Sequence, residues 1–350
     1  MPLYTVTPDQ DSDAVNGVKT VAPYLPSSLV PASALANIYA LVEKLPFLPF
    51  AGFECRLEAG NDQVDYFANI PRFEGSIPPE FFPQANWPML EGIYRLWLNN
   101  QSRIGRDINE LGLEIDLANA MDKLPAPGIF MAVRNTVSDP CPVLYDALDL
   151  LFDADLSAEL KQNIQRCVKA LPKGGIVSHL GAMLSRKSRG IRLNIAGLGF
   201  DDVQSYLAAI GWNETSAELD HVLKNYRHYT DHFVLCIDLL GQAIGPRIGF
   251  ECYVHTAPAD GPKWEQLMQQ LLRDDICSGQ KKAALLSWPG IAEYSTHADT
   301  WPINQRSISA LLGSYGLDVC NRTLNHIKLS IIPGLGMQAK GYFLYQYRWI

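Results

Sequence analysis

The sequence predicts an α+β protein built around a ten-stranded antiparallel β-barrel with a polar interior and helices on its outside. From about residue 50 to the end, one unit recurs: two short strands, then an amphipathic helix. Within the strands every second residue is apolar, and the residues between are charged or hydroxylated. The polar positions mix Tyr, His, Arg and Glu, whereas an ordinary solvated face favours Lys, Glu, Ser and Thr.

The expected elements follow one another in a regular order along the chain. The first unit has strands Gly52–Ala59 and Gln63–Ile70 and a helix at Trp87–Arg103, and the second has strands Gly112–Ala118 and Ile129–Asn135 and a helix at Leu156–Leu171. The third has strands Val177–Ser185 and Ile191–Ala196 and two helices, Asp201–Ile210 and Ala217–Tyr229. The fourth has strands His232–Leu240 and Arg247–His255 and a helix at Trp264–Asp274, and the last strand pair is His326–Ile332 and Ala339–Trp349. The units share a pattern without obvious sequence identity. We therefore interpret the repeat as architectural.

Alternation along each strand assigns its side chains to two faces. In Arg247–His255 one face is Ile248, Phe250, Cys252 and Val254. The helix that follows each pair needs an apolar surface to pack on, so we expect the apolar face outside and the polar face inside. An open sheet with one solvated face would show the same alternation. Closure is favoured because long twisted sheets tend to curl and a closed barrel has no exposed edges.

Composition narrows the classes of function. The net charge is −8 and no long basic stretch occurs, which argues against nucleic-acid binding. Seven scattered cysteines without a CxxC motif indicate buried thiols in a reducing compartment. We see no signal peptide and no apolar run of membrane-spanning length, so the expected location is the cytoplasm, away from membranes.

Domain organisation is expected to be simple. Residues 1–49 are predicted to form an N-terminal arm and a lead-in helix, and residues 50–350 a single barrel domain, because no linker interrupts the strand rhythm. Met1–Ala22 is polar and contains two prolines, which predicts a poorly ordered arm.

The polar face gathers many ionisable groups. Arginine and lysine supported by tyrosine hydroxyls are the usual way to hold a diphosphate, and binding an anion would justify burying cations. The other interpretation is a set of internal Arg–Glu pairs that only stabilise the barrel. The expected interior residues are Arg56, Arg134, Arg192, Arg247, Lys328, Lys340, Tyr253, Tyr342, Glu54, Glu114, Asp116, Asp238 and Glu251.

Two segments resemble a known family. Phe50-Ala-Gly-Phe-Glu-Cys-Arg-Leu-Glu58, followed by Gln63–Ile70, resembles the first hairpin of the dimethylallyltryptophan synthase branch of the aromatic prenyltransferases, whose fold is the ABBA or PT barrel. Ala339-Lys-Gly-Tyr-Phe343 resembles the Lys-x-Tyr strand motif of the same family. Cyanobacterial prenyltransferases that modify ribosomal peptides share this barrel.

The resemblance implies transfer of an allylic prenyl group from its diphosphate to an aromatic small molecule or a peptide side chain. It places the base on Glu54 and diphosphate contacts on Lys340 and Tyr342. We expect the other interior cations to assist, and Tyr66 and Tyr253 to shield the allylic cation. The middle hairpins depart from the family, with Ala132-Val-Arg134, Arg192-Leu-Asn194 and Glu251-Cys-Tyr253 in place of Lys-x-Tyr. Mg²⁺ is a candidate cofactor, for which Glu114, Asp116 or Asp238 could supply oxygen ligands.

Two other functions remain open from the sequence. The first is a barrel enzyme that tailors a peptide or natural-product intermediate by acid–base chemistry, which a pair of close carboxylates without a diphosphate grip would favour. The second is a barrel that binds a peptide or lipid without catalysis, which a mostly apolar lumen would favour.

Overall fold

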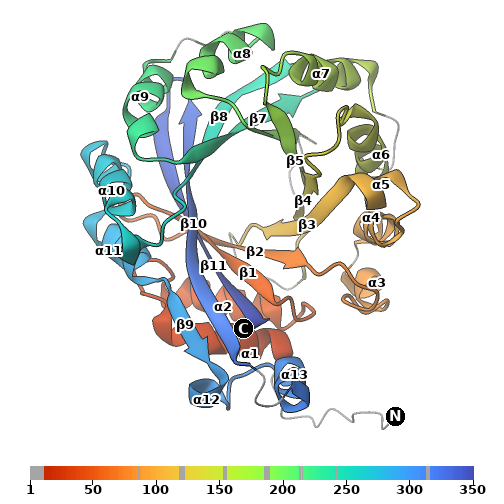
Figure 1. The fold of residues 1–350 in the computed structure, drawn as a ribbon, viewed down its shortest axis with the longest axis vertical. Helices are drawn as coiled ribbons and strands as arrows, with labels where there is room; N and C mark the ends of the chain where they lie inside the picture. The colour runs from red at the N-terminus through yellow and green to blue at the C-terminus, as the bar shows by residue number, and fades with distance from the viewer. Residues whose placement is uncertain are drawn as a thin grey trace.

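Ten strands close into one antiparallel barrel in the computed structural model, which describes residues 12–85, 87–117, 123–152, 156–184, 190–212, 214, 216–241, 243–312 and 316–350. β1 pairs with β2 and β11, and β10 pairs with β8 and β11, so the sheet has no open edge around the barrel (Figure 1). An eleventh strand, β9, pairs with the first part of β10 outside this ring. The predicted closed barrel is confirmed.

The strands agree with the expected pairs in order, with different bounds. They are β1 (Phe50–Arg56), β2 (Val64–Ile70), β3 (Ile108–Ile115), β4 (Gly128–Val133), β5 (Ile176–Met183), β6 (Ile191–Ala196), β7 (His232–Leu240), β8 (Ala243–Tyr253), β9 (Gly290–Glu293), β10 (Asp318–Ile332) and β11 (Gly336–Trp349). β10 begins eight residues before the predicted His326, because its first part pairs with β9 and β11. The expected strand ends at Ala118 and Ser185 lie outside the described residues.

Helices surround the barrel on its outer side (Figure 1). They are α1 (Asp13–Val21), α2 (Ala32–Val42), α3 (Phe81–Ala85), α4 (Pro88–Leu98), α5 (Arg103–Asp107), α6 (Cys141–Phe152), α7 (Ala158–Lys169), α8 (Val203–Ala209), α9 (Ala217–Asn225), α10 (Lys263–Arg273), α11 (Gly279–Ser287), α12 (Tyr294–His297) and α13 (Ile303–Leu312). In the described part of the chain, none of them combines the length and apolar character that crossing a membrane requires.

The prediction of a poorly ordered arm over Met1–Ala22 is wrong for its second half. Ser12 caps α1 by accepting a hydrogen bond from the Val15 amide, as hydroxyl side chains commonly do at helix starts. Val18 and Val21 are fully buried, and the Tyr347 hydroxyl donates to the Gly17 carbonyl. Val18 and Val21, which stand among polar residues in the sequence, therefore hold this helix against β11. Residues 1–11 lie outside the described part.

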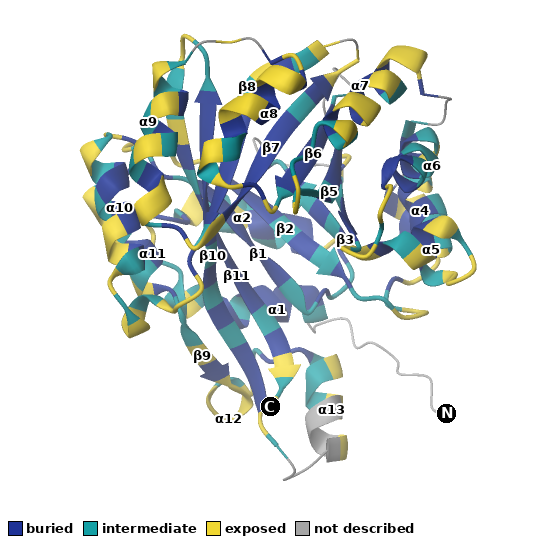
Figure 2. Ribbon diagram, turned by 45° about the horizontal axis from the view of Figure 1, so that its top comes forward, coloured by how far each residue is buried: buried dark blue, intermediate teal, exposed yellow. Residues whose placement is uncertain are grey.

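The main apolar core lies between the barrel wall and the helices, as alternation predicts. Phe250 on β8 and Phe343 on β11 are fully buried, and Trp288 packs edge-on against Phe343 with ring centroids 5.2 Å apart. Figure 2 shows the strands mostly buried and the exposed positions concentrated on the outer surfaces of the helices. The polar faces of the strands are thereby turned into the lumen.

Two glycines make room for aromatic rings inside the barrel. A Cβ at Gly52 would lie 2.5 Å from the Phe67 ring, and a Cβ at Gly181 would lie 2.7 Å from the Phe130 ring. Contacts this short do not occur between real side chains, so these positions accept only glycine if the rings keep their places. Both phenylalanines line the lumen cavity described next.

Candidate active site in the barrel lumen

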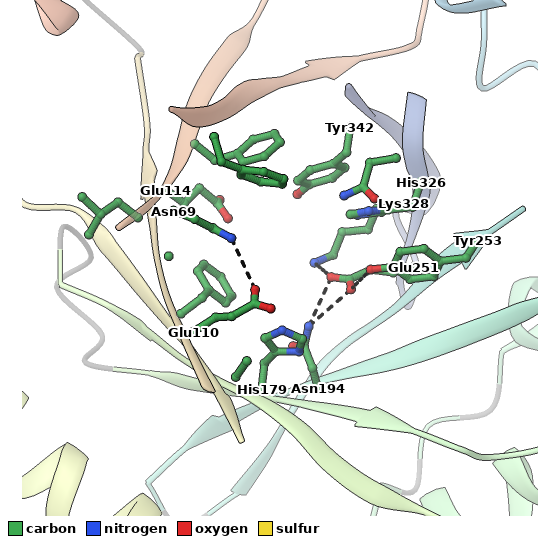
Figure 3. A pocket seen from close by; sticks show the side chains of 17 residues that line it. Asn69, Glu110, Glu114, His179, Asn194, Glu251, Tyr253, His326, Lys328 and Tyr342 are labelled. Atoms are coloured by element: carbon green, nitrogen blue, oxygen red, sulfur yellow. Dashed lines mark hydrogen bonds and ion pairs between the residues drawn. The ribbon is translucent and has the colours of Figure 1, made fainter. Parts of the chain in front are cut away.

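A cavity of about 320 Å³ lies in the lumen. Asn69 on β2 and Glu110 and Glu114 on β3 line one side of it (Figure 3). The opposite side and the floor in that view carry residues of β5, β6, β8, β10 and β11, namely His179, Asn194, Glu251, Tyr253, His326, Lys328 and Tyr342 (Figure 3). The cavity therefore has an acidic wall facing a wall of rings and one lysine–glutamate pair.

Glu54 is held by three donors. Its carboxylate accepts hydrogen bonds from Arg56, from the Tyr342 hydroxyl and, at 2.5 Å, from Lys340 Nζ. Burial alone would raise the pKa of Glu54, but the charges of Lys340 and Arg56 hold this pKa well below its usual range. Arg56 also bonds Asp65 at 3.1 Å. Glu54, only 1% exposed, is thus a permanently ionised carboxylate, and it is not among the described residues that line the cavity.

Glu251 forms a second closed cluster. It accepts from Lys328 Nζ at 2.9 Å, from Asn194 Nδ2 at 3.3 Å and from the Tyr253 hydroxyl at 3.3 Å. Burial opposes ionisation, but Lys328 keeps the pKa of Glu251 well below its usual range. Glu251, which stands where the family's motif has a lysine, is therefore the counter-ion of Lys328 on the neighbouring strand.

The third cluster pairs Arg192 with Asp238. Arg192 is buried and donates from Nε to Oδ1 at 2.8 Å and from Nη2 to Oδ2 at 3.2 Å. Burial of Asp238 is outweighed by Arg192, with a further contribution from Arg247, so the pKa of Asp238 is lowered. The structure thus brings Arg56, Arg192, Lys328 and Lys340 into the lumen as predicted, but each is bonded to a carboxylate.

The expected position of Arg134 inside the barrel is wrong. β4 ends at Val133, and the Arg134 side chain turns to the Arg106 carbonyl, 2.7 Å from Nε, and to Asn109 Oδ1, 3.2 Å from Nη1. Alternation assigns a side chain to a face only while the strand continues. Arg134 therefore lies at the end of the barrel wall.

The expected position of Tyr66 in the lumen is also wrong. Tyr66 stands opposite Phe53 across the β1–β2 pair, and its hydroxyl bonds the Tyr345 hydroxyl at 3.1 Å within the outer core. Its neighbours Asp65 and Phe67 take the inner positions, because Asp65 pairs with the inward Glu54. Tyrosine is amphipathic, so its presence does not reveal which face of a strand is polar.

A row of neighbouring aromatic rings crosses the inner face from β11 to β7. His326 lies between Tyr342, with centroids 4.2 Å apart, and Tyr253, at 4.8 Å, and Tyr253 stacks on His232 at 4.6 Å. Burial lowers the pKa of His326 to about 4, so its ring is neutral. Both ring nitrogens are buried without a hydrogen-bond partner in the described chain. Sequence reasoning missed His326, although its spacing of two from Lys328 placed it on the same face.

Glu114 differs from the other lumen carboxylates. It is half-buried, lines the cavity, and has no hydrogen bond or ion pair with any described side chain. Burial and the nearby charge of Glu54 raise the pKa of Glu114 to about 7. A carboxyl group that titrates near neutrality can take or give a proton there.

The residues expected as Mg²⁺ ligands do not assemble into a metal site. Asp238 is bonded to Arg192, and Asp116 lies beyond the end of β3 at Ile115. Within the described ranges, no group of three or more His, Cys, Asp or Glu side chains is placed to hold a metal ion.

Comparison with known proteins identifies the fold. No family model matches the sequence, and no curated protein matches it. Among solved structures, AnaPT from Neosartorya fischeri is similar with a TM-score of 0.59 and 12% identity, over 97% of this chain and 94% of that one. The prenyltransferase PriB, in its ternary complex with L-tryptophan and dimethylallyl thiolodiphosphate, is similar with a TM-score of 0.54 and 12% identity, over 94% of each chain. The chain therefore has the PT-barrel fold.

Proposed function

We propose that this protein transfers an allylic prenyl group from its diphosphate to an aromatic acceptor bound in the barrel cavity. The observation that carries the proposal is a cavity of about 320 Å³ that is lined by aromatic rings and by the buried Lys328. One of these rings, Tyr342, also bonds the Glu54 carboxylate, on which the cations Lys340 and Arg56 converge. Rings attract and shield a carbocation, by about 0.5–2 kcal/mol for each well-placed ring. Cationic groups stabilise the negative charge that develops on the departing diphosphate. The likeness to PriB supports the same chemistry at the level of the fold.

We assign the donor side to Lys340, Arg56 and Tyr342, with Lys328 nearby on the cavity wall. The first three converge on the Glu54 carboxylate as they would on a phosphate oxygen. Binding the diphosphate then requires that its oxygens replace part of this carboxylate's contacts, or that a divalent cation accompanies the diphosphate. Arg192 and Arg247, near Asp238, add positive charge farther along the lumen.

The size of the cavity favours a small acceptor. Ligand pockets are typically about 300–1,000 Å³, and this one lies at the small end of that range. We propose an aromatic small molecule or a single aromatic side chain of a peptide, seated between the acidic wall on β3 and the rings on β8, β10 and β11. The seven cysteines are all free and buried, which supports a reducing compartment such as the cytoplasm.

Calorimetry on the full chain tests the donor site. We expect micromolar binding of dimethylallyl or geranyl thiodiphosphate, measured with and without Mg²⁺, and its loss in Lys340→Ala. Arg134→Ala is the matched control, because this cation lies outside the lumen and should leave donor binding unchanged. Mass spectrometry of incubations with dimethylallyl diphosphate and a panel of aromatic acceptors then detects transfer. No binding under either condition, together with no transfer, contradicts the proposal.

A second candidate function is supported by the same cluster geometry. Each of Lys328, Lys340 and Arg192 is already bonded to a carboxylate, and Glu114 faces the cavity without a hydrogen bond or ion pair to any described residue. These features favour acid–base tailoring of a peptide or natural-product intermediate, without a prenyl donor. Binding of aromatic amines or short aromatic peptides in the absence of any thiodiphosphate binding would support this function over prenyl transfer.

A further inference from the structure

Among the described residues, one carboxyl group of the cavity's acidic wall has no hydrogen bond or ion pair within the protein. Glu114 projects from the inner face of β3, and its cross-strand neighbours are Phe67 on β2 and Gly128 on β4. Neither neighbour can donate a hydrogen bond from its side chain. The Glu114 carboxyl therefore faces the cavity with its oxygens available to a ligand (Figure 3).

The other carboxylates near the cavity are already engaged. Glu54 accepts from three cationic or hydroxyl donors and does not line the cavity. Glu251 is bonded to Lys328, and Glu110 accepts from Asn69 Nδ2 at 3.3 Å. A carboxylate whose lone pairs are held by cations is a weak base, because protonation would break those contacts.

The histidines of the cavity are no better placed to take a proton. Both ring nitrogens of His326 are buried, and the ring lies between Tyr342, which stacks on it, and Tyr253, which is tilted against it. His179 Nδ1 lies 3.2 Å from the Ser178 hydroxyl, and burial lowers the pKa of His179. Glu114 is thus the one described carboxyl of the wall that combines access to the cavity with freedom from a protein partner.

We infer that Glu114 is the catalytic residue that takes the acceptor's proton, in place of Glu54, an inference that rests on the proposed prenyl transfer. The bond between the allylic carbon and the diphosphate oxygen breaks, and its electron pair leaves with the diphosphate. The acceptor ring forms the new bond to the allylic carbon and loses one proton. That proton passes to a Glu114 oxygen and afterwards to water, which restores the carboxylate.

The surroundings of Glu114 set the pH at which this role operates. Burial and the negative charge of Glu54 favour its protonated form, whereas Lys340, Lys328 and Arg192 favour its ionised form. Glu110, four positions away on the same face of β3, and Glu251 on the opposite wall are the other acidic groups among the described residues that line the cavity. With a pKa of about 7, the ionised form needed for proton uptake becomes dominant above neutral pH.

The test compares Glu114→Gln with Glu110→Gln and Glu54→Gln, using thiodiphosphate affinity, kcat, KM and the pH profile of kcat/KM. Glu114→Gln should lower kcat by about 100-fold or more, leave donor affinity within twofold, and abolish the acidic limb near pH 7. Glu110→Gln, on the same wall, should keep that limb. Glu114→Asp, which retains the acid on a shorter side chain, should recover part of kcat and the limb.

Failure of the inference is distinguishable from failure of the proposed function. Full kcat with an intact acidic limb in Glu114→Gln overturns the role of Glu114 while leaving prenyl transfer standing. Loss of the limb in Glu54→Gln alone returns the role to Glu54. Absence of both donor binding and transfer in the wild-type protein overturns the proposed function, and this inference with it. If Glu114→Gln does not fold, Glu114→Ala carries the same comparison, because it also removes the carboxyl group.

Discussion

The raised pKa of Glu114 predicts an unusual pH dependence of stability. Folding shifts the pKa of this group from its usual 4.5 to about 7. Between these values the native state binds more protons than the unfolded state, so the native state loses stability as the pH rises. The stabilisation is complete below pH 4.5 and is lost as the pH passes through 7. Replacing Glu114 with Gln, which cannot ionise, should remove this loss.

The magnitude follows from the two pKa values. A shift of about 2.5 units corresponds to about 3 kcal/mol when the group is fully ionised, at 1.36 kcal/mol for each unit. Part of this is already lost at pH 5, so the change between pH 5 and pH 8 is about 2.5 kcal/mol. The difference in unfolding free energy between Glu114→Gln and wild type should therefore shift by about this amount in favour of the variant.

Chemical denaturation at several pH values measures this difference. Taking the variant minus wild type cancels the groups that titrate equally in both proteins. Phe130→Leu is a suitable control, because it alters the cavity wall without removing a titratable group, so its difference from wild type should not vary with pH. A difference for Glu114→Gln that is constant from pH 5 to pH 8 would refute the assignment of a raised pKa to Glu114.

Three other substitutions separate the roles of neighbouring groups. Glu54→Gln leaves Lys340 without its counter-ion and Arg56 with Asp65 alone, and it should lower the unfolding free energy by about 3–5 kcal/mol in denaturant titrations; an unchanged midpoint would show that Lys340 does not depend on Glu54 for its charge compensation. Tyr66→Phe should lower stability by about 1 kcal/mol and leave turnover unchanged, because this hydroxyl lies in the outer core; a loss of turnover would argue for a role in the lumen. His326→Phe keeps a ring in the stack and removes two unpartnered nitrogens, so the melting temperature should stay constant or rise; a marked fall would mean that these nitrogens are bonded in solution.

Much of the barrel could be predicted from the sequence because alternation is a local property. Ile248, Phe250 and Cys252 point outward and Glu251 inward, as the pattern indicates. The same rule fails at Arg134, where the strand has already ended. At Tyr66 the alternation holds, but the assignment of polar residues to the inner face fails, because Tyr66 points outward and the apolar Phe67 points inward.

The pairing of charges could not be predicted, because it depends on register across strands that are distant in the sequence. Lys328 on β10 stands opposite Glu251 on β8, 77 positions away, and Lys340 reaches Glu54 across the closure of β11 on β1. From the sequence alone, these cations are expected to form an anion-binding site. In the closed barrel each is bonded to a carboxylate.

Glu114 is the lumen carboxyl group that this pairing leaves without a hydrogen bond or ion pair among the described residues. Buried charges persist in a folded protein only when partners or ligands compensate for their lost hydration. Glu54 and Glu251 meet that requirement with Lys340 and Lys328. Glu114 does not, because Phe67 and Gly128 flank it. Its pKa is therefore raised to about 7, and the carboxyl group is only partly ionised at neutral pH. An acceptor that donates a hydrogen bond to Glu114 would supply the missing partner. The lack of a partner for Glu114 therefore has two consequences: it lowers the free energy of unfolding at high pH, and it favours binding and deprotonation of such an acceptor.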